Sequence, residues 1–139
     1  MVDSYKRLHE LLAENKFSQV PAEAETLRRD VHSLLGIDPS SKPERYENLV
    51  DKLHGSIDQF TPKDIDQARV EFGQISADLI AFLKEFMPQL DDPLYIIKCP
   101  MWNKSPAVWL QDSTDVKNPF LGPDMPTCGT VQETLRTER

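Results

Sequence analysis

Apolar side chains recur every three or four positions through the first two thirds of the chain, which is the spacing of one face of an α-helix. The pattern predicts four amphipathic helices. The apolar stripes run from Tyr5 to Leu12, from Ala24 to Leu35, from Tyr46 to Phe60 and from Ile65 to Phe86. Short connections between successive helices favour antiparallel neighbours, so we expect an antiparallel four-helix bundle over residues 1–92.

Residues that commonly begin or end helices lie at the ends of these apolar stripes. They are Pro21, Ser41 and Thr61 at predicted helix starts, and Gly36 and Pro88 at predicted helix ends. Ser41 precedes Glu44 by three residues, which is the form of a capping box. Thr61 is predicted to cap the fourth helix, because its hydroxyl can accept a free backbone N–H of the first turn. A loop is expected at residues 37–42.

The pattern changes after Asp92. Prolines now interrupt every segment that could form a helix, at positions 100, 106, 119, 123 and 126. The runs from Tyr95 to Cys99 and from Ala107 to Leu110 have the composition of short β-strands. Four aromatic residues are available for packing: Tyr95, Trp102, Trp109 and Phe120. We expect one mainly α domain over residues 1–139, in which residues 93–139 form a compact tail of short β-strands and turns packed on the bundle.

Composition narrows the range of functions. The chain has 39% hydrophobic and 28% charged residues, which is typical of a soluble globular protein, and no apolar stretch is long enough to span a bilayer. Its net charge of -7 argues against a nucleic-acid partner, since phosphate binding depends on clustered Lys and Arg. No basic segment followed by an apolar segment begins the chain, so we expect either a cytoplasmic protein or one whose export signal has been removed.

Sulfur is concentrated in the tail, in two short clusters. Cys99 and Met101 flank Pro100, and Met125 precedes Cys128 by three residues. Together they offer two thiolates and two thioethers, which are the soft donors that suit Cu(I) or Ag(I), whereas Mg²⁺ and Ca²⁺ need oxygen. Zinc normally takes histidine or more cysteines. The sequence predicts that these four residues converge on one soft metal ion.

Other interpretations of the same residues stay open. Cys99 and Cys128 could instead form a disulfide in an oxidising compartment, and a methionine is most often core filler. Trp102 and Trp109 are interpreted as packing residues. The three histidines, His9, His32 and His54, lie at the margins of apolar stripes and are interpreted as half-buried structural residues. If a helix supplies a further ligand, His9 or His54 is the candidate.

The tail also resembles a known family. The runs LYIIKCPMW and VWLQDSTDVKNPFLGPDMPTCGTVQETL resemble a bacterial cell-envelope domain of unknown function, found alone or fused to the periplasmic adaptor subunits of copper and silver efflux pumps. The shared signature consists of C-P-M, a W-L pair, N-P-aromatic-x-G and M-x-x-C-G. The helix DIDQARVEFGQISADLIAFLKEF, residues 64–86, is similar too. Trp102 and Phe120 stand where that family commonly has a small residue and a tyrosine.

The resemblance implies heavy-metal binding in the periplasm or cell envelope, with Cys99, Met101, Met125 and Cys128 as ligands. It also implies periplasmic efflux adaptor or pump components as partners. No nucleophile elbow, phosphate-binding loop, H-E-x-x-H or C-x-x-C motif is present in the sequence, which favours a binding protein over an enzyme. The first hypothesis is sequestration or transfer of Cu(I) or Ag(I). The alternative is a structural or protein-interaction domain with a disulfide between Cys99 and Cys128.

Overall fold

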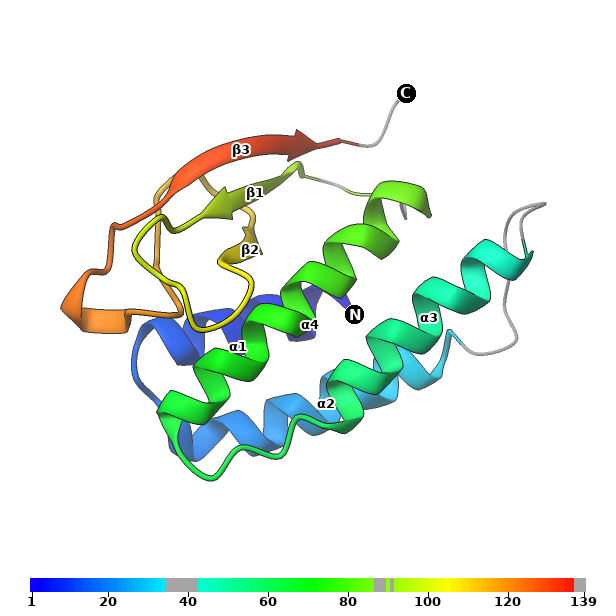
Figure 1. Ribbon diagram of the computed structural model, residues 1–139, viewed down its shortest axis with the longest axis horizontal. Coiled ribbons are helices and arrows are strands. Elements are labelled where there is room, and N and C mark those ends of the chain that lie inside the picture. The colour runs from blue at the N-terminus through cyan, green and yellow to red at the C-terminus, as the bar shows by residue number, and fades with distance from the viewer. Residues whose placement is uncertain (35–42, 87–89, 91, 137–139) are drawn as a thin grey trace.

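The computed structural model describes residues 1–34, 43–86, 90 and 92–136. Within them, helices come first and a small sheet follows (Figure 1). The helices are α1 (Val2–Ala13), α2 (Val20–His32), α3 (Pro43–Asp58) and α4 (Ile65–Glu85). The strands are β1 (Leu94–Lys98), β2 (Val108–Gln111) and β3 (Thr130–Leu135), and two short 3-10 turns are η1 (Phe17–Gln19) and η2 (Gly122–Asp124). The prediction of a mainly α chain with short C-terminal strands is confirmed.

The start of α4 differs from the prediction. Asp64, not Thr61, is the N-cap, and its side chain accepts a hydrogen bond from the backbone N–H of Gln67. The Gln67 side chain in turn accepts the N–H of Lys63 at 2.9 Å. Two otherwise free N–H groups are thereby satisfied by one Asp and Gln pair, which is why the helix begins three residues later. The predictions for Gly36, the loop 37–42, Ser41 and Pro88 lie outside the described residues.

The three strands form one antiparallel sheet in the order β2-β1-β3. In β1, the central strand, Ile97 pairs with Trp109 on one side and with Val131 on the other. The sequence predicted β1 and β2 but not β3, which is exposed along most of its length and therefore lacks an apolar stripe. Figure 1 shows β3 on the outer side of the sheet, away from the helices.

One cluster of buried apolar side chains extends from the helices into the sheet. Tyr5 of α1 joins three elements within it: its hydroxyl lies 2.6 Å from Ser76 Oγ of α4 and accepts the backbone N–H of Leu110 in β2 at 3.1 Å. Complete burial raises the pKa of this phenol well above its usual value. Because its ring also stacks on Phe72, Tyr5 fixes where the sheet lies on α4.

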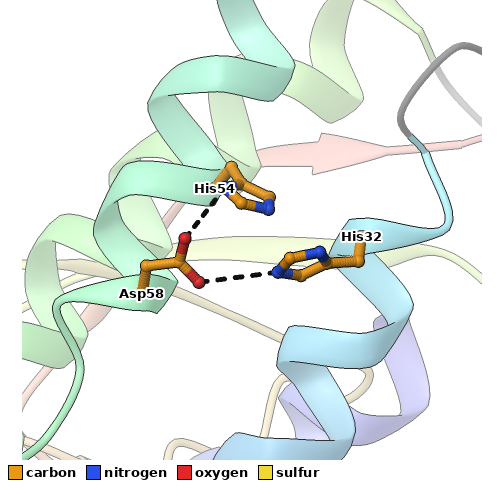
Figure 2. A group of neighbouring side chains, drawn as sticks. All are labelled: His32, His54 and Asp58. Atoms are coloured by element: carbon orange, nitrogen blue, oxygen red, sulfur yellow. Dashed lines mark ion pairs between the residues drawn. The ribbon is translucent and has the colours of Figure 1, made fainter.

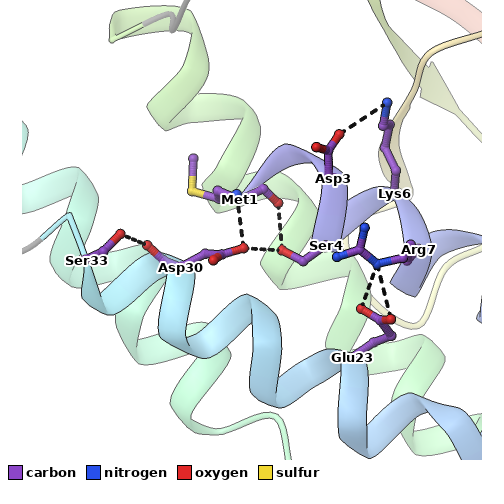
Figure 3. Close-up of polar contacts among 8 residues, drawn as sticks. All are labelled: Met1, Asp3, Ser4, Lys6, Arg7, Glu23, Asp30 and Ser33. Carbon is purple, nitrogen blue, oxygen red and sulfur yellow. Dashed lines mark hydrogen bonds and ion pairs between the residues drawn. The ribbon is translucent and has the colours of Figure 1, made fainter.

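Polar side chains join α1 to α2 at the surface (Figure 3). Asp30 accepts a hydrogen bond from Ser4 Oγ at 2.6 Å, and its carboxylate lies 3.0 Å from the Met1 amino group. Arg7 lies one turn after Ser4 in α1, and its Nε lies 3.1 Å from a carboxylate oxygen of Glu23, which lies two turns before Asp30 in α2. These contacts set the position of α1, which carries Tyr5 against the sheet. None of the helices in the described residues is both long and apolar enough to cross a membrane.

The segment between β1 and β2 lies directly on α4. A Cβ atom at Gly73 would stand 2.4 Å from Ser105 Oγ and 2.5 Å from the carbonyl oxygen of Pro106. The same Ser105 Oγ accepts the indole N–H of Trp102 at 2.9 Å, and the Trp102 ring stacks on Phe120. A glycine is therefore needed in α4 for the connection that begins at Cys99 to pack this closely.

Candidate metal site

The sheet brings the two cysteine segments together. Cys99 directly follows β1, and Cys128 lies two residues before β3. The last pair between these antiparallel strands is Lys98 with Thr130, so both cysteines lie at the same end of the sheet. Their Sγ atoms are 3.2 Å apart and both are free thiols. The predicted meeting of the two remote cysteines is present in the fold.

Asn118 holds the second cysteine segment in place. Its fully buried side chain accepts the backbone N–H groups of Phe120 and Leu121, each at 2.8 Å. The amide nitrogen donates to the carbonyl oxygen of Cys128 at 2.6 Å, and the Asn118 N–H donates to the carbonyl of Pro126. The N-P-F-L-G segment thus acts as a clamp on the M-P-T-C-G segment, a role that sequence analysis did not assign to it.

Gly129 permits the close approach of the Cys128 segment to the sheet. A Cβ atom at this position would stand 2.8 Å from Ile97 Cγ2 and 2.8 Å from Trp109 Cη2. Trp109 is fully buried and meets Phe120 edge-on, with the ring centroids 5.6 Å apart. Both tryptophans are packing residues, as predicted, and both belong to the buried apolar cluster that includes Cys99.

The two thiols differ in environment. Cys99 is fully buried in the apolar cluster, whereas Cys128 is half-buried. Desolvation and the neighbouring Cys99 sulfur raise the pKa of the Cys128 thiol, although a hydrogen bond from the backbone N–H of Met101 opposes this effect. The Cys128 sulfur therefore keeps its proton at neutral pH, and a metal ion must displace that proton in order to bind.

Met101 and Met125 are not core filler. Their side chains are 62% and 44% exposed, and both are among the most exposed large hydrophobic residues of the described chain. Met101 lies two residues after Cys99, and the Met125 carbonyl accepts the N–H of Cys128 at 3.3 Å. The structure brings the two cysteines together directly and leaves the two thioethers largely exposed beside them in the chain. Convergence of all four sulfur atoms on one ion stays a prediction.

The distance between the two sulfur atoms can be compared with those in a disulfide and in a metal site. A disulfide requires the sulfur atoms at about 2.0 Å, whereas two thiolates that share one metal ion at about 2.3 Å stand about 4 Å apart. The distance of 3.2 Å lies between these values. Both a disulfide and a shared metal ion therefore require the sulfur atoms to move from this separation.

Among the described residues, no histidine or carboxylate completes the thiol pair. In that part of the chain, the group His32, His54 and Asp58 is the single set of three or more His, Cys, Asp or Glu residues whose ligand atoms lie close together. His9 donates from Nε2 to the carbonyl oxygen of Lys117 at 2.7 Å and is buried, whereas the sequence predicted a half-buried position for it.

The group of His32, His54 and Asp58 was missed by sequence analysis. His54 and Asp58 are four residues apart on α3, a spacing that places both side chains on one helix face and was visible in the sequence. The contribution of His32 from α2 depends on how the two helices pack, which the sequence did not show. Figure 2 shows the three side chains turned toward one another.

Comparisons with protein-family models, with curated proteins and with solved structures found no match to this chain.

Proposed function

We propose that this protein binds a soft monovalent metal ion, Cu(I) or Ag(I), through the thiolates of Cys99 and Cys128. Met101 and Met125 would add thioether sulfur from the exposed side. The observation that carries the proposal is the 3.2 Å separation of two free thiols from segments 29 residues apart. A donor set made only of sulfur favours Cu(I) and Ag(I) over hard cations.

The surroundings of the thiol pair support a tight but exchangeable site. Cys99 is fully buried in the same apolar cluster as Trp109 and Phe120, so water has little access to this thiol. The exposed thioethers of Met101 and Met125 offer neutral, weaker ligands on the accessible side. Such an arrangement is suited to sequestering a soft metal and to passing it on by ligand exchange.

The cellular setting of the proposal comes from the resemblance of the tail to metal-efflux domains. It suggests a periplasmic or cell-envelope protein that delivers its metal to an efflux adaptor or pump and carries out no catalysis. In this proposal the helices form an antiparallel four-helix bundle that serves as a rigid support. Its contact with the sheet through Tyr5 and Gly73 would keep the cysteine segments in register.

Metal titration of the reduced protein under nitrogen tests the proposal directly. We expect one equivalent of Cu(I) to bind in competition with a chromophoric Cu(I) chelator. Cys99→Ser and Cys128→Ser should each weaken binding by more than the roughly 10- to 100-fold typical of residues outside the ligand shell. Met101→Leu and Met125→Leu should weaken it by smaller factors. Unchanged affinity in both cysteine variants, with the helical circular dichroism retained, would refute the assignment.

The thiol distance also favours a second candidate, a structural or protein-interaction domain in which Cys99 and Cys128 form a disulfide. The sulfur atoms need to approach by about 1 Å to reach bonding distance. A thiol count on protein purified without reductant separates the two candidates. Two reactive thiols support the metal site. No thiols before reduction, together with no Cu(I) uptake after it, would favour the disulfide domain.

A further inference from the structure

A second group of metal-binding side chains lies between α2 and α3. His32 ends α2, and His54 and Asp58 lie one turn apart near the end of α3. Each residue offers one ligand atom, and these atoms all lie within 4.8 Å of one another. The two imidazole rings are 4.0 Å apart between centroids, so a single ion between the helices is within reach of both.

The carboxylate of Asp58 orients both histidines (Figure 2). Its Oδ2 lies 3.0 Å from His54 Nδ1, and its Oδ1 lies 3.6 Å from His32 Nε2. A neutral His54 that donates from Nδ1 to this carboxylate has its remaining lone pair on Nε2. Carboxylates commonly hold metal-binding histidines in this way, which fixes the tautomer and the ring orientation.

His54 Nε2 is an unsatisfied atom. It is buried, and no group in the described part of the chain forms a hydrogen bond with it. A buried polar atom without a partner costs about 1 to 3 kcal/mol, so such an atom calls for an explanation. The lone pair of Nε2 is the one that a metal ion would use, and Figure 2 shows this nitrogen on the side of the ring that faces His32.

The positively charged side chain of Arg28 competes with a metal ion for the Asp58 carboxylate. Its Nε lies 3.6 Å from Asp58 Oδ1, but its Nη2 donates to the carbonyl oxygens of Ile57 and Phe60. The guanidinium is thus held by the end of α3 and approaches only one oxygen of Asp58. The other oxygen, Oδ2, faces His54 Nδ1, so the carboxylate holds the ring in place and leaves His54 Nε2 for an ion that enters between the helices.

We propose that His32 and His54 bind one divalent transition-metal ion, such as Zn(II) or Ni(II), between α2 and α3, with Asp58 as the carboxylate that orients the rings. Imidazole nitrogen suits these borderline ions, and its bonds to zinc are about 2.0 to 2.1 Å long. Two protein ligands leave further positions for water or for ligands from another molecule. This site is separate from the soft-metal thiol pair and does not depend on the function proposed for it.

The test uses the Cys99→Ser, Cys128→Ser double variant, in which the thiols cannot compete for Zn(II). We expect one equivalent of Zn(II) in isothermal titration calorimetry. His32→Ala and His54→Ala in this background should each weaken binding by at least about tenfold, and Asp58→Asn should weaken it less. Asp51→Asn is the matched control, because it removes the same charge from α3 outside the group, and it should leave the affinity unchanged.

A second measurement keeps the test valid if the double variant does not fold. In the reduced wild-type protein, Zn(II) should shift the NMR ring signals of His32 and His54 and leave those of buried His9 in place. The proposal is overturned if His32→Ala and His54→Ala bind Zn(II) as tightly as their parent. It is equally overturned if Zn(II) leaves the ring signals of both histidines unchanged.

Discussion

Residues of one type take different roles in this protein because burial and neighbours differ. Of the three histidines, His9 is buried and donates to a backbone carbonyl, whereas His32 and His54 lie together beside a carboxylate. The cysteines and methionines also differ from one another in burial. Cys99 is buried and Met101, only two residues later, is 62% exposed. The role of each of these side chains therefore depends on its burial and on the groups beside it.

His9 makes stability depend on pH. Burial lowers the pKa of this imidazole from 6.5 to about 4, while in the unfolded chain it returns to its ordinary value. The unfolded state therefore binds more protons between these values, so stability is complete above about pH 6.5 and is lost as the pH falls toward 4. A shift of this size corresponds to about 3 kcal/mol.

The check is urea denaturation of wild-type protein and His9→Gln between pH 7 and pH 4. Glutamine can still donate to the Lys117 carbonyl but does not titrate in this range, so the variant should lose less stability on acidification. Parallel loss of stability in wild type and His9→Gln would contradict the assignment.

At the scale of the elements, the sheet is positioned by close contacts with α4 and α1. Gly73 allows the segment after Cys99 to approach α4, and Tyr5 connects α1 to both α4 and β2. The clamp formed by Asn118 then holds the Cys128 segment beside the end of β1. Each thiol is therefore placed by contacts between elements, and the cysteine sequences themselves contribute little to its position.

Two glycines inside helices should respond to alanine with opposite signs. A Cβ atom at Gly55 of α3 would meet nothing within 4 Å, so Gly55→Ala should stabilise the protein by about 0.5 to 1 kcal/mol through helix propensity. Gly73→Ala gains the same propensity but forces Cβ against Ser105 and the Pro106 carbonyl. Because overpacking costs about 1 to 3 kcal/mol, we expect a net loss.

Thermal unfolding followed by circular dichroism measures both effects. Gly55→Ala is the matched control for Gly73→Ala, since each replaces a helical glycine by the same residue. Stabilisation by both substitutions would show that the segment after Cys99 does not pack on α4 as described. Gly73→Ala should also weaken Cu(I) binding, because displacement of this segment moves Cys99.

For the whole molecule, a bound metal ion links two remote parts of the chain and should stabilise the fold. At a free Ag(I) concentration 100 times its Kd, the linkage relation gives about 2.7 kcal/mol. With an unfolding entropy of about 0.3 kcal/mol/K for a chain of 139 residues, the melting temperature should rise by about 9 °C.

Differential scanning calorimetry of the reduced protein with and without Ag(I) tests this expectation. The Cys99→Ser, Cys128→Ser double variant should show no comparable rise, because it lacks the two thiolates that we propose as ligands. An equal rise in the double variant would show that Ag(I) stabilises the fold from another site. Zn(II), which the site between α2 and α3 is proposed to bind, should still stabilise this variant.

The sequence by itself determined the elements that depend on local patterns. Apolar spacing predicted the positions of all four helices, and β-branched and aromatic runs predicted β1 and β2, because these signals act within a few residues of the chain. It also singled out Cys99 and Cys128 by their chemistry. The start of α4 and the existence of β3 were not predicted, since the first depends on a choice between neighbouring caps and the second on pairing with a distant strand.

Only the tertiary structure decided which of these residues meet. The separation of the thiols depends on the register of β1 with β3 and on the Asn118 clamp, and both arise from contacts across the chain. Likewise, His32 joins His54 and Asp58 only because α2 packs against α3. The sequence gives the type of each side chain. A binding site also requires side chains from remote segments to lie close together, and tertiary packing sets the distance between them.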